Sequence, residues 1–416
     1  MFCSSTSRTE NLRICRYLSH VTNIMSSPLI KRQSHLEYYQ QHGIAPVSYD
    51  LSSLDAHFDR RRSLYNKLGL PSLAFAGSDV LEVAAGTGHN SLFIAAQHPR
   101  KNVLLEPNPT AIDHIHAAYA GFKLSHTKPE LITNKLEDFN PPDLFDIVLC
   151  ENWLGTSTHE LGLLSKLASF IRPGGVLVVT TVSPIGFVPN LMRRYFAYHI
   201  ASPDLSFETR TSLLASAYSS HLGHLGEMTR NVTDWVQDNM INPAYFGLCL
   251  SSPAVLSHLG DSFEVLGAYP AFIEDWRWFK ALHGDERAIN KQFLSEYWLK
   301  CHNFFDSRLI PFTRDIAINQ ALEKAASLLL KSIEACEDAA LNKTDLKLYT
   351  HDVASHFNEF LTLIPEKMIE AKVSLQELSP WVSEPNKISV QTLANLGKFA
   401  KLFGRETSYL ALQRSK

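Results

Sequence analysis

The hydrophobic positions in the first half of the chain fall into short runs that alternate with patterns of helical spacing. Apolar runs typical of buried strands occupy residues 79–85, 102–107, 130–133, 145–151 and 175–182. Apolar side chains lie three or four positions apart in residues 53–70, in the segment from 91 and in residues 110–119. This spacing predicts helices. Because strands that alternate with helices form a parallel sheet covered on both faces, the pattern predicts a doubly wound α/β domain.

The pattern changes after residue 183. Residues 184–250 have mainly helical spacing and many aromatic side chains, and they are too long for an ordinary connection, so we expect a helical insertion. Residues 262–272 and 274–282 read as two more strands, which complete a mostly parallel sheet of seven strands. Beyond residue 284 the spacing is helical again, most clearly over 321–341 and 388–403.

These patterns predict three parts of the chain. Residues 1–34 form a leader that is expected to be disordered, and residues 35–283 form the α/β domain with its insertion at about 184–250. Residues 284–416 form a helical C-terminal domain. The apolar faces of its helices serve either to pack them into a bundle or to pair two copies as a homodimer, and the sequence pattern leaves both open.

Composition narrows the class of protein. Of 416 residues, 45% are apolar and 19% charged, the balance of a globular domain with an ample core. The net charge of −3 predicts no nucleic-acid partner, which usually requires a basic face. Six scattered cysteines without a CxxC pair indicate reduced thiols, and we expect a cytoplasmic protein. No uncharged apolar run approaches ~18 residues, so no membrane span is expected.

The composition of the leader allows two interpretations. Arg8, Arg13 and Arg16 stand against one acid, Glu10, among many hydroxyl residues. This composition is either that of an organelle transit peptide or that of a tail upstream of a true start at Met25.

The residues that follow the first predicted strand carry the clearest chemistry. Glu82 lies in the strand, and Gly86 and Gly88 follow it in a turn that opens a helix, which lets the backbone approach a ligand. Glu106 ends the next strand twenty residues later, where it is placed to accept bonds from two ribose hydroxyls. A dinucleotide site requires a third glycine where Ser91 stands, and the Glu82 carboxylate would repel a pyrophosphate. A cationic aminoacyl cofactor has no such conflict.

This motif resembles the first motif of the class I S-adenosylmethionine-dependent methyltransferase family. The matching residues are Glu82, Ala84, Gly86 and Gly88, with Ala84 standing where many members carry glycine. The resemblance implies S-adenosylmethionine as cofactor, with the glycines passing under its methionine part and Glu82 near its amino group. It also implies cofactor contacts for the remaining predicted residues of this set, namely Asn90, Glu106, Asn108, Leu136, Glu137 and Asn152. Lys135 stands where an acid is common, which weakens the adenine assignment.

We expect the residues that bind the methyl acceptor to lie after the fourth strand and in the insertion. Glu151 acts as a catalytic base, or as a hydrogen-bond acceptor that orients the substrate, or it contacts the cofactor only. Trp153 follows it as a predicted substrate residue. Asp234 and Asp238 are four residues apart, so they would share a helix face. They either hold a polyol or an amine, bind a divalent metal, or form a solvated helix face paired with Arg230. The predicted substrate residues of the insertion are Asn190, Arg193, Arg194, Asp234, Trp235, Asp238 and Asn239.

Three further features each allow a functional and an ordinary structural interpretation. Arg193 and Arg194 either grip a phosphate or carboxylate or lie on an ordinary surface helix. Tyr38 and His42 either close over the cofactor as a lid or pack as ordinary aromatics. Residues 140–143, NPPD, resemble the signature of amino-methyltransferases, but they precede the fourth strand and lack its terminal aromatic. No histidine cluster predicts a metal site.

These observations lead to three functional hypotheses. The first is methyl transfer to a small polar molecule, such as a sugar or glycan precursor. The second is a catalytically silent scaffold that binds an adenosyl cofactor, against which the intact motif argues. The third is aminopropyl transfer, whose family carries paired acids after the fourth strand, where this chain has only Glu151.

Overall fold

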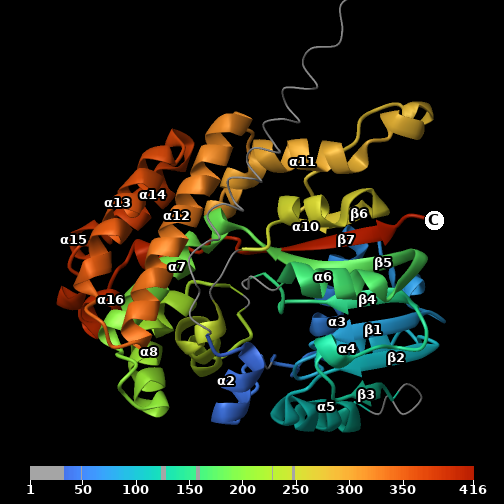
Figure 1. Cartoon of the computed structure of the whole chain (residues 1–416), viewed down its shortest axis with the longest axis horizontal. Helices are drawn as coiled ribbons and strands as arrows, with labels where there is room; N and C mark the ends of the chain where they lie inside the picture. Colours follow the sequence, from blue (N-terminus) through green and yellow to red (C-terminus); the bar gives the residue numbers. More distant parts are fainter. Residues whose placement is uncertain (1–31, 48, 123–127, 156–159, 227, 246–248) are drawn as a thin grey trace, which may run out of the picture. The chain divides into compact units, whose positions relative to one another are not determined.

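A sheet of seven strands forms the centre of the α/β part in the computed structural model (Figure 1). Its order is β3-β2-β1-β4-β5-β7-β6, and β7 runs antiparallel to both of its neighbours while the other paired strands are parallel. The strands are β1 (Asp79–Val83), β2 (Lys101–Leu105), β3 (Glu130–Ile132), β4 (Phe145–Cys150), β5 (Ile171–Val182), β6 (Phe263–Tyr269) and β7 (Thr407–Arg414). The predicted doubly wound, mostly parallel sheet of seven strands is confirmed.

The structure describes residues 32–416 except 48, 123–127, 156–159, 227 and 246–248. The leader predicted for residues 1–34 therefore lies almost wholly outside the described residues. The description that follows concerns the unit from Ser34 to Lys416.

The origin of the seventh strand corrects the sequence prediction. Residues 274–282 were expected to form a strand, but they contain only the short turn η6 (Phe279–Ala281), and Trp276 is 90% exposed. The strand comes instead from β7, near the end of the chain, where Leu410 and Leu412 are fully buried between β5 and β6. Burial of an apolar segment with strand alternation between β5 and β6 is more favourable in free energy than burial of the segment 274–282 would be.

Helices cover the sheet on its faces. They are α3 (Leu54–Lys67), α4 (Ser91–Ala95), α5 (Pro109–Gly121), α6 (Glu160–Ser169) and α10 (Ser252–Leu259). Tyr65 of α3 and Phe93 of α4 stack with ring centroids 5.6 Å apart, in one core with Val80, Leu149 and Val178 of the strands. α6 and α10 pack on each other and on β5. Burial of these apolar faces fixes the helices to the sheet.

A helical layer lies beside the sheet, on the left of Figure 1. The insertion contributes α7 (Pro184–Ile200), α8 (Phe207–Leu222) and α9 (Val232–Val236), which continues into the π-helical turn η3 (Gln237–Ile241). The later residues add α11 (Ile289–Lys300), α12 (Ile316–Leu341), α13 (Lys347–Leu363), α14 (Ile369–Gln376), α15 (Ser379–Val382) and α16 (Val390–Ala394). α7 packs on α12, α12 on α13, and α8 on α16. The insertion is helical, as predicted.

The start of α7 ties this layer to the sheet. Ser183 follows β5 directly and caps α7, its hydroxyl accepting the Gly186 N–H at 3.2 Å, with Pro184 at the first helical position. α7 therefore begins at the edge where β5 ends. The short helix α2 (His35–His42) is closed by a capping box between Ser34 and Glu37.

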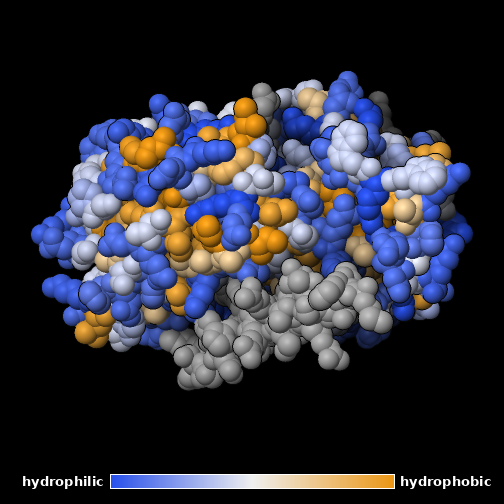
Figure 2. Space-filling view, turned by 90° about the horizontal axis from the view of Figure 1, so that it is seen from above, coloured by the Kyte–Doolittle hydropathy of each residue, from blue (hydrophilic) through white to orange (hydrophobic). Residues whose placement is uncertain are grey.

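Apolar side chains reach the surface in several places. In the view of Figure 2 they gather mainly in the left half of the molecule, with hydrophilic side chains between them. Leu348 and Ile369 of the C-terminal helices are among the exposed ones. Within the described part of the chain, no helix combines the length and apolar character needed to cross a bilayer.

Candidate active site

The carboxyl ends of β1, β2, β4 and β5 lie side by side at one edge of the sheet. The strand register pairs Val83 with Leu105 on one side and with Cys150 on the other, and it pairs Cys150 with Val179. The residues that directly follow these strands therefore meet at this edge. Ligands of open α/β sheets bind in the same place.

The turn after β1 has a backbone that brings peptide groups to this edge. Ala84, Gly86 and Gly88 all have positive φ, at 56°, 56° and 73°. A Cβ at position 88 would lie 2.8 Å from Cγ1 and 3.4 Å from Cα of Ile115 in α5, so only glycine fits there. Ala84 adopts the left-handed conformation in spite of its Cβ.

Glu106, which follows β2, is held by the backbone of this turn. Its Oε2 accepts the Gly86 N–H at 2.8 Å and its Oε1 accepts the Asn108 N–H at 2.9 Å. Burial raises the pKa of the Glu106 carboxyl to about 7, while these two N–H groups oppose the rise. Each oxygen keeps a further lone pair, so the oriented carboxylate fits a pair of vicinal hydroxyls.

Glu82 lies beneath the turn with an unused carboxylate oxygen. The side chain is buried, and its Oε2 has no hydrogen-bond partner in the described structure. Burial, together with the neighbouring carboxylates of Glu151 and Glu106, raises the pKa of Glu82 to about 8. A buried carboxylate oxygen without a donor, near two other carboxylates, fits a cationic ligand and repels a pyrophosphate.

Glu151, the first residue after β4, is fastened to α3. Nη2 of Arg61 lies 2.7 Å from both of its carboxylate oxygens, and the Tyr65 hydroxyl donates to Oε1 at 2.7 Å. The side chains of Arg61 and Glu151 are 8% and 5% exposed. The carboxylate is thus held by three hydrogen bonds, which fix its position.

Asn152 and Trp153 follow at the same edge. Asn152 has a φ of 56°, its N–H donates to Thr180 Oγ1 of β5 at 2.9 Å, and its Nδ2 donates to the Tyr409 hydroxyl of β7 at 3.3 Å. Asn152 is exposed and Trp153 is half-buried. β4, β5 and β7 therefore present a connected row of polar groups at their ends.

A segment before α3 crosses the glycine turn; we call residues 44–47 with 49 the N-terminal strap. Three hydrogen bonds hold it, from Asn108 Nδ2 to Ile44 O at 3.0 Å, from Thr87 Oγ1 to Val47 O at 3.1 Å and from Tyr49 N to His89 Nδ1 at 3.1 Å. A Cβ at Gly86 would lie 3.3 Å from Val47 Cγ2. The strap therefore lies directly over the turn.

The residues expected to form a lid lie just before the strap, in α2. The Tyr38 hydroxyl donates to Gln237 O at 2.8 Å, and the His42 ring stacks on Phe207 with centroids 3.9 Å apart. Both side chains thus pack on the insertion, and the strap, not these two aromatics, covers the turn.

The acids of the insertion lie in different surroundings. Asp238 is buried, accepts Arg230 Nη2 at 2.6 Å and accepts the Tyr39 hydroxyl at 2.6 Å. The N–H of Asp234 is capped by Asn231 Oδ1 at 2.8 Å. Because the helix changes to π geometry at Gln237, the regular spacing that would place the two acids on one face ends there.

The other two predicted residues of this segment are packed. Trp235 is buried against the ring of Tyr218, with centroids 5.9 Å apart. Asn239 Nδ2 donates to Trp235 O at 3.1 Å. Both belong to the packing of α9 on α8.

Arg193 and Arg194 are fully buried in the helical layer. Arg194 forms an ion pair with Glu337 of α12 at 3.0 Å. Arg193 donates to the carbonyl of Leu402 at 3.0 Å and to Asn190 Oδ1 at 3.2 Å. Because protein groups take up these donors, we reassign both arginines from anion binding to packing of the layer.

The remaining predicted cofactor residues lie around the turn. Leu136 is buried and opens the short turn η2 (Leu136–Asp138), in which Glu137 is exposed. Asn90 precedes α4, and its carbonyl accepts the Phe93 N–H at 3.2 Å.

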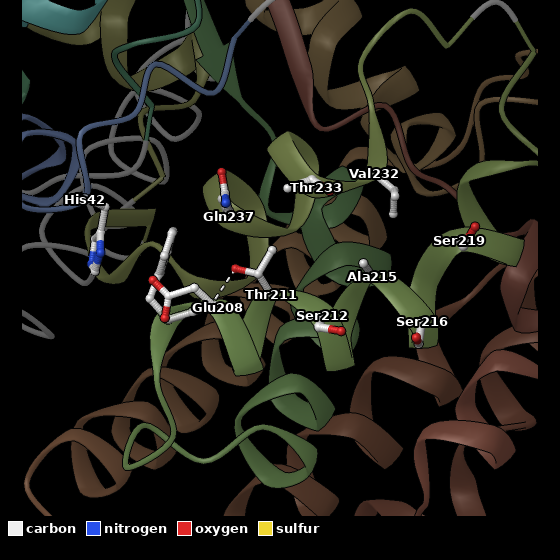
Figure 3. Close-up of a pocket in the computed structure, with 11 residues that line it drawn as sticks. His42, Glu208, Thr211, Ser212, Ala215, Ser216, Ser219, Val232, Thr233 and Gln237 are labelled. Carbon is white, nitrogen blue, oxygen red and sulfur yellow. Dashed lines mark hydrogen bonds between the residues drawn. The ribbon is translucent and has the colours of Figure 1, made fainter.

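A separate pocket of about 660 Å³ lies between α8, α9 and the end of α2 (Figure 3). Its wall on α8 consists mainly of small side chains, Thr211, Ser212, Ala215, Ser216 and Ser219. His42 lies at one end of it, so this predicted substrate residue belongs to the pocket and not to the strand ends.

Four polar residues of the site were not singled out from the sequence. Arg61 and Tyr65 lie one turn apart on α3, where Tyr65 read as part of an apolar face. Glu406 and Tyr409 follow the helix predicted for 388–403 and lie in the C-terminal part predicted to be helical, but they belong to β7 and the residue before it. The alternation of buried positions over 407–414 was the signal that could have revealed that strand. Among the described residues, no group of three or more His, Cys, Asp or Glu side chains is arranged to hold a metal ion.

Comparison with known structures gave partial matches of low similarity. Magnesium protoporphyrin IX methyltransferase (ChlM) from Synechocystis PCC 6803, with bound SAM, is 16% identical over 35% of this chain and 74% of its own, with a TM-score of 0.29. The N-methyltransferase NodS from Bradyrhizobium japonicum WM9, in complex with S-adenosyl-L-homocysteine, is 20% identical over 35% and 73%, with a TM-score of 0.28. The CcbJ methyltransferase from Streptomyces caelestis is 18% identical over 27% of this chain and 45% of its own, with a TM-score of 0.25. This chain therefore spans less than half the length of CcbJ.

The search of curated protein sequences gave no match. A family model described as a methyltransferase domain matches residues 56–226. This stretch begins within α3, contains the glycine turn, Glu106 and Glu151, and ends within the insertion. The matched residues supply the unpartnered carboxylate, the oriented Glu106 and the turn that the expected cofactor requires. This match identifies residues 56–226 as a methyltransferase domain.

Proposed function

We propose that this protein transfers the methyl group of S-adenosylmethionine to a hydroxyl or amine of a small polar acceptor, such as a sugar or glycan precursor. The observation that carries the proposal is the buried Oε2 of Glu82, which has no partner in the described structure and lies at the glycine turn beside the oriented Glu106. A cofactor with an ammonium group, a sulfonium and a ribose diol meets both requirements.

Each part of the edge then has a task toward the cofactor. Glu82 holds the ammonium group, and Glu106 accepts bonds from the two ribose hydroxyls. Leu136 and Glu137 flank the adenine, and Asn90 and Asn108 border the turn. When bound, the cofactor supplies a methyl group on positively charged sulfur. The N-terminal strap over the turn excludes water from this group.

Glu151 acts in this proposal as a positioning residue. The hydrogen bonds from Arg61 and Tyr65 fix its carboxylate at the end of β4, between the cofactor side and Asn152. The negative charge of Glu151 favours a cationic methyl donor at this edge. In this role the carboxylate does not need to accept a proton. Methyl transfer is an in-line displacement, so alignment supplies much of the acceleration.

The polar groups beyond the strand ends support a polar acceptor. Asn152 is exposed, and Arg230 has a buried Nε without a partner in the described structure. Tyr409 and Glu406 are only half-buried. Donors and acceptors that are partly desolvated and not fully satisfied favour a ligand that carries hydroxyl or amine groups.

Calorimetric titration of the purified chain with S-adenosylmethionine, S-adenosylhomocysteine and NAD tests the cofactor. Binding of the adenosyl compounds alone supports the proposal, and binding of NAD alone overturns it. Transfer of label from methyl-labelled S-adenosylmethionine into fractionated polar metabolites and saccharides then tests the acceptor. Tight cofactor binding without transfer to any fraction would favour the silent scaffold over the enzyme.

A further inference from the structure

Glu406 lies at the edge where the parallel strands end, although it comes from the other end of the chain. It directly precedes β7, and its carbonyl accepts the N–H of Ser183, the residue after β5, at 2.8 Å. Three positions after Glu406, β7 places Tyr409 opposite Thr180, the residue that holds the Asn152 N–H. The acid is therefore part of the same edge as Asn152.

The backbone around Glu406 is fixed by close packing of two glycines. A Cβ at Gly404 would lie 2.0 Å from Gly186 O, and a Cβ at Gly186 would lie 2.2 Å from Arg405 O. The Arg405 N–H also donates to Phe304 O at 2.7 Å. The start of α7 and the residues before β7 thus interlock, which keeps the Glu406 side chain in place relative to β5.

One carboxylate oxygen of Glu406 accepts a hydrogen bond from a described residue, and the other does not. Asn190 Nδ2 of α7 donates to Oε2 at 3.1 Å. Arg193 Nη1 donates to Asn190 Oδ1 at 3.2 Å, which sets the orientation of that amide. Oε1 of Glu406 has no hydrogen bond to a described residue. The buried Arg193 therefore acts as a positioning residue for Asn190, and through it for Glu406.

Two other carboxylates near Glu406 are held by protein donors. Glu151 is held by Arg61 and Tyr65, and Asp238 is held by Arg230 and Tyr39. Glu82 and Glu106 lie at the glycine turn, on the cofactor side. On the acceptor side, at the ends of β4, β5 and β7 near Asn152, Glu406 keeps a carboxylate oxygen without a described protein donor.

Resting on the proposed function, we propose that Glu406 binds the nucleophilic hydroxyl or amine of the acceptor and removes its proton during methyl transfer. The acceptor's oxygen or nitrogen forms a bond to the methyl carbon as the carbon–sulfur bond breaks, and the bonding pair stays on sulfur. The acceptor's proton passes to Oε1 of Glu406 and then to solvent. The acceptor class is therefore a neutral hydroxyl or amine that must lose a proton, not a preformed thiolate or carbanion.

The electrostatic surroundings suit this task. Burial raises the pKa of Glu406 to about 7, and the charges of Arg193 and Arg230 oppose the rise while that of Asp238 adds to it. A base is most effective when its pKa lies near the working pH. The rate should therefore rise with pH as Glu406 loses its proton.

The test compares Glu406→Gln with the unchanged chain. The amide keeps the size of the side chain and its place beside Asn190 but accepts no proton. We expect methyl transfer to the labelled fraction to fall about 10²–10⁴-fold and the rise of rate with pH to disappear. Calorimetric binding of S-adenosylmethionine should be unchanged, because Glu406 lies on the acceptor side.

Two further variants keep the result interpretable. Glu406→Asp retains a carboxylate and should keep the pH dependence at a lower rate, which a purely structural role would not produce. Glu384→Gln, at an exposed ion pair with Lys387, is the matched control and should leave the rate unchanged. A full rate in Glu406→Gln overturns the inference. Absence of transfer by the unchanged chain, with cofactor bound, overturns the proposed function itself.

Discussion

The guanidinium of Arg61 lies 2.7 Å from both carboxylate oxygens of Glu151, and both side chains are almost fully buried. This contact joins α3 to the end of β4 across ninety positions of sequence. It also places a positive charge near Glu82, whose carboxylate would otherwise lie near those of Glu106 and Glu151 without a counter-ion. The pair therefore serves both the fold and the electrostatics of the cofactor side.

Arg61→Ala should lower the free energy of unfolding by about 3–5 kcal/mol, because it leaves the buried Glu151 carboxylate without its partner. The measurement is chemical denaturation at pH 7. Arg62→Ala is the matched control, since the neighbouring arginine pairs with Asp59 at the surface with side chains 51% and 69% exposed. Equal losses of unfolding free energy in both variants would show that the buried ion pair contributes no more to stability than the exposed one.

Ala84→Gly should raise the free energy of unfolding by about 0.5–1 kcal/mol. Ala84 has a φ of 56°, where a Cβ is unfavourable and glycine is not, and this gain exceeds the extra freedom that glycine has in the unfolded chain. Thermal denaturation measures the change. Ala85→Gly is the control: position 85 is not among the described residues with positive φ, so the same substitution should lower stability. A loss at both positions would contradict the argument.

The cofactor side was predictable from the sequence because its signals are local. Glu82, Gly86 and Gly88 lie within seven positions, and Glu106 ends the next strand of the same βαβ unit. Each role follows from a strand, a turn and a strand end, which short-range patterns reveal. The sheet then brings these residues together by register alone.

The acceptor side was not predictable in the same way. Tyr409 reaches Asn152 from 257 positions away, and Glu406 reaches Asn190 from 216 positions away. No local pattern encodes such a contact, because it depends on which strand fills the gap between β5 and β6. Arg193 was singled out for its charge, yet burial among the carbonyls near Leu402 gives it a packing role that the sequence pattern does not distinguish.

Glu106→Ala should weaken binding of S-adenosylmethionine and S-adenosylhomocysteine by about 1–3 kcal/mol, because two bonds to ribose hydroxyls are lost. Isothermal calorimetry measures both ligands. Glu130→Ala, on β3 in an exposed pair with Lys101, is the control and should not change the affinity. An affinity for Glu106→Ala equal to that of the unchanged chain would mean that the ribose lies elsewhere.

The last prediction concerns pH and Glu82. The pKa of this carboxyl is raised from its ordinary 4.5 to about 8, mainly by burial. A folded-state pKa above the unfolded value means that the empty folded protein binds the proton more tightly. The contribution of Glu82 to stability is therefore fully present below pH 4.5 and is lost as pH rises towards 8. A cationic ligand reverses this preference, because it favours the ionised carboxylate.

Binding of S-adenosylmethionine at pH 7 should therefore release a proton, and its affinity should increase between pH 6 and pH 7. Calorimetry in two buffers with different ionisation enthalpies measures the release directly. Glu82→Gln removes the titrating group, so both the release and the pH dependence should diminish in that variant, whereas Glu130→Gln on the exposed strand β3 should retain them. If Glu82→Gln released the same number of protons as the unchanged chain, the unpartnered oxygen of Glu82 would not be where the cation binds, and the ionisation of another buried group, such as Glu106 with its pKa of about 7, would have to account for the linkage.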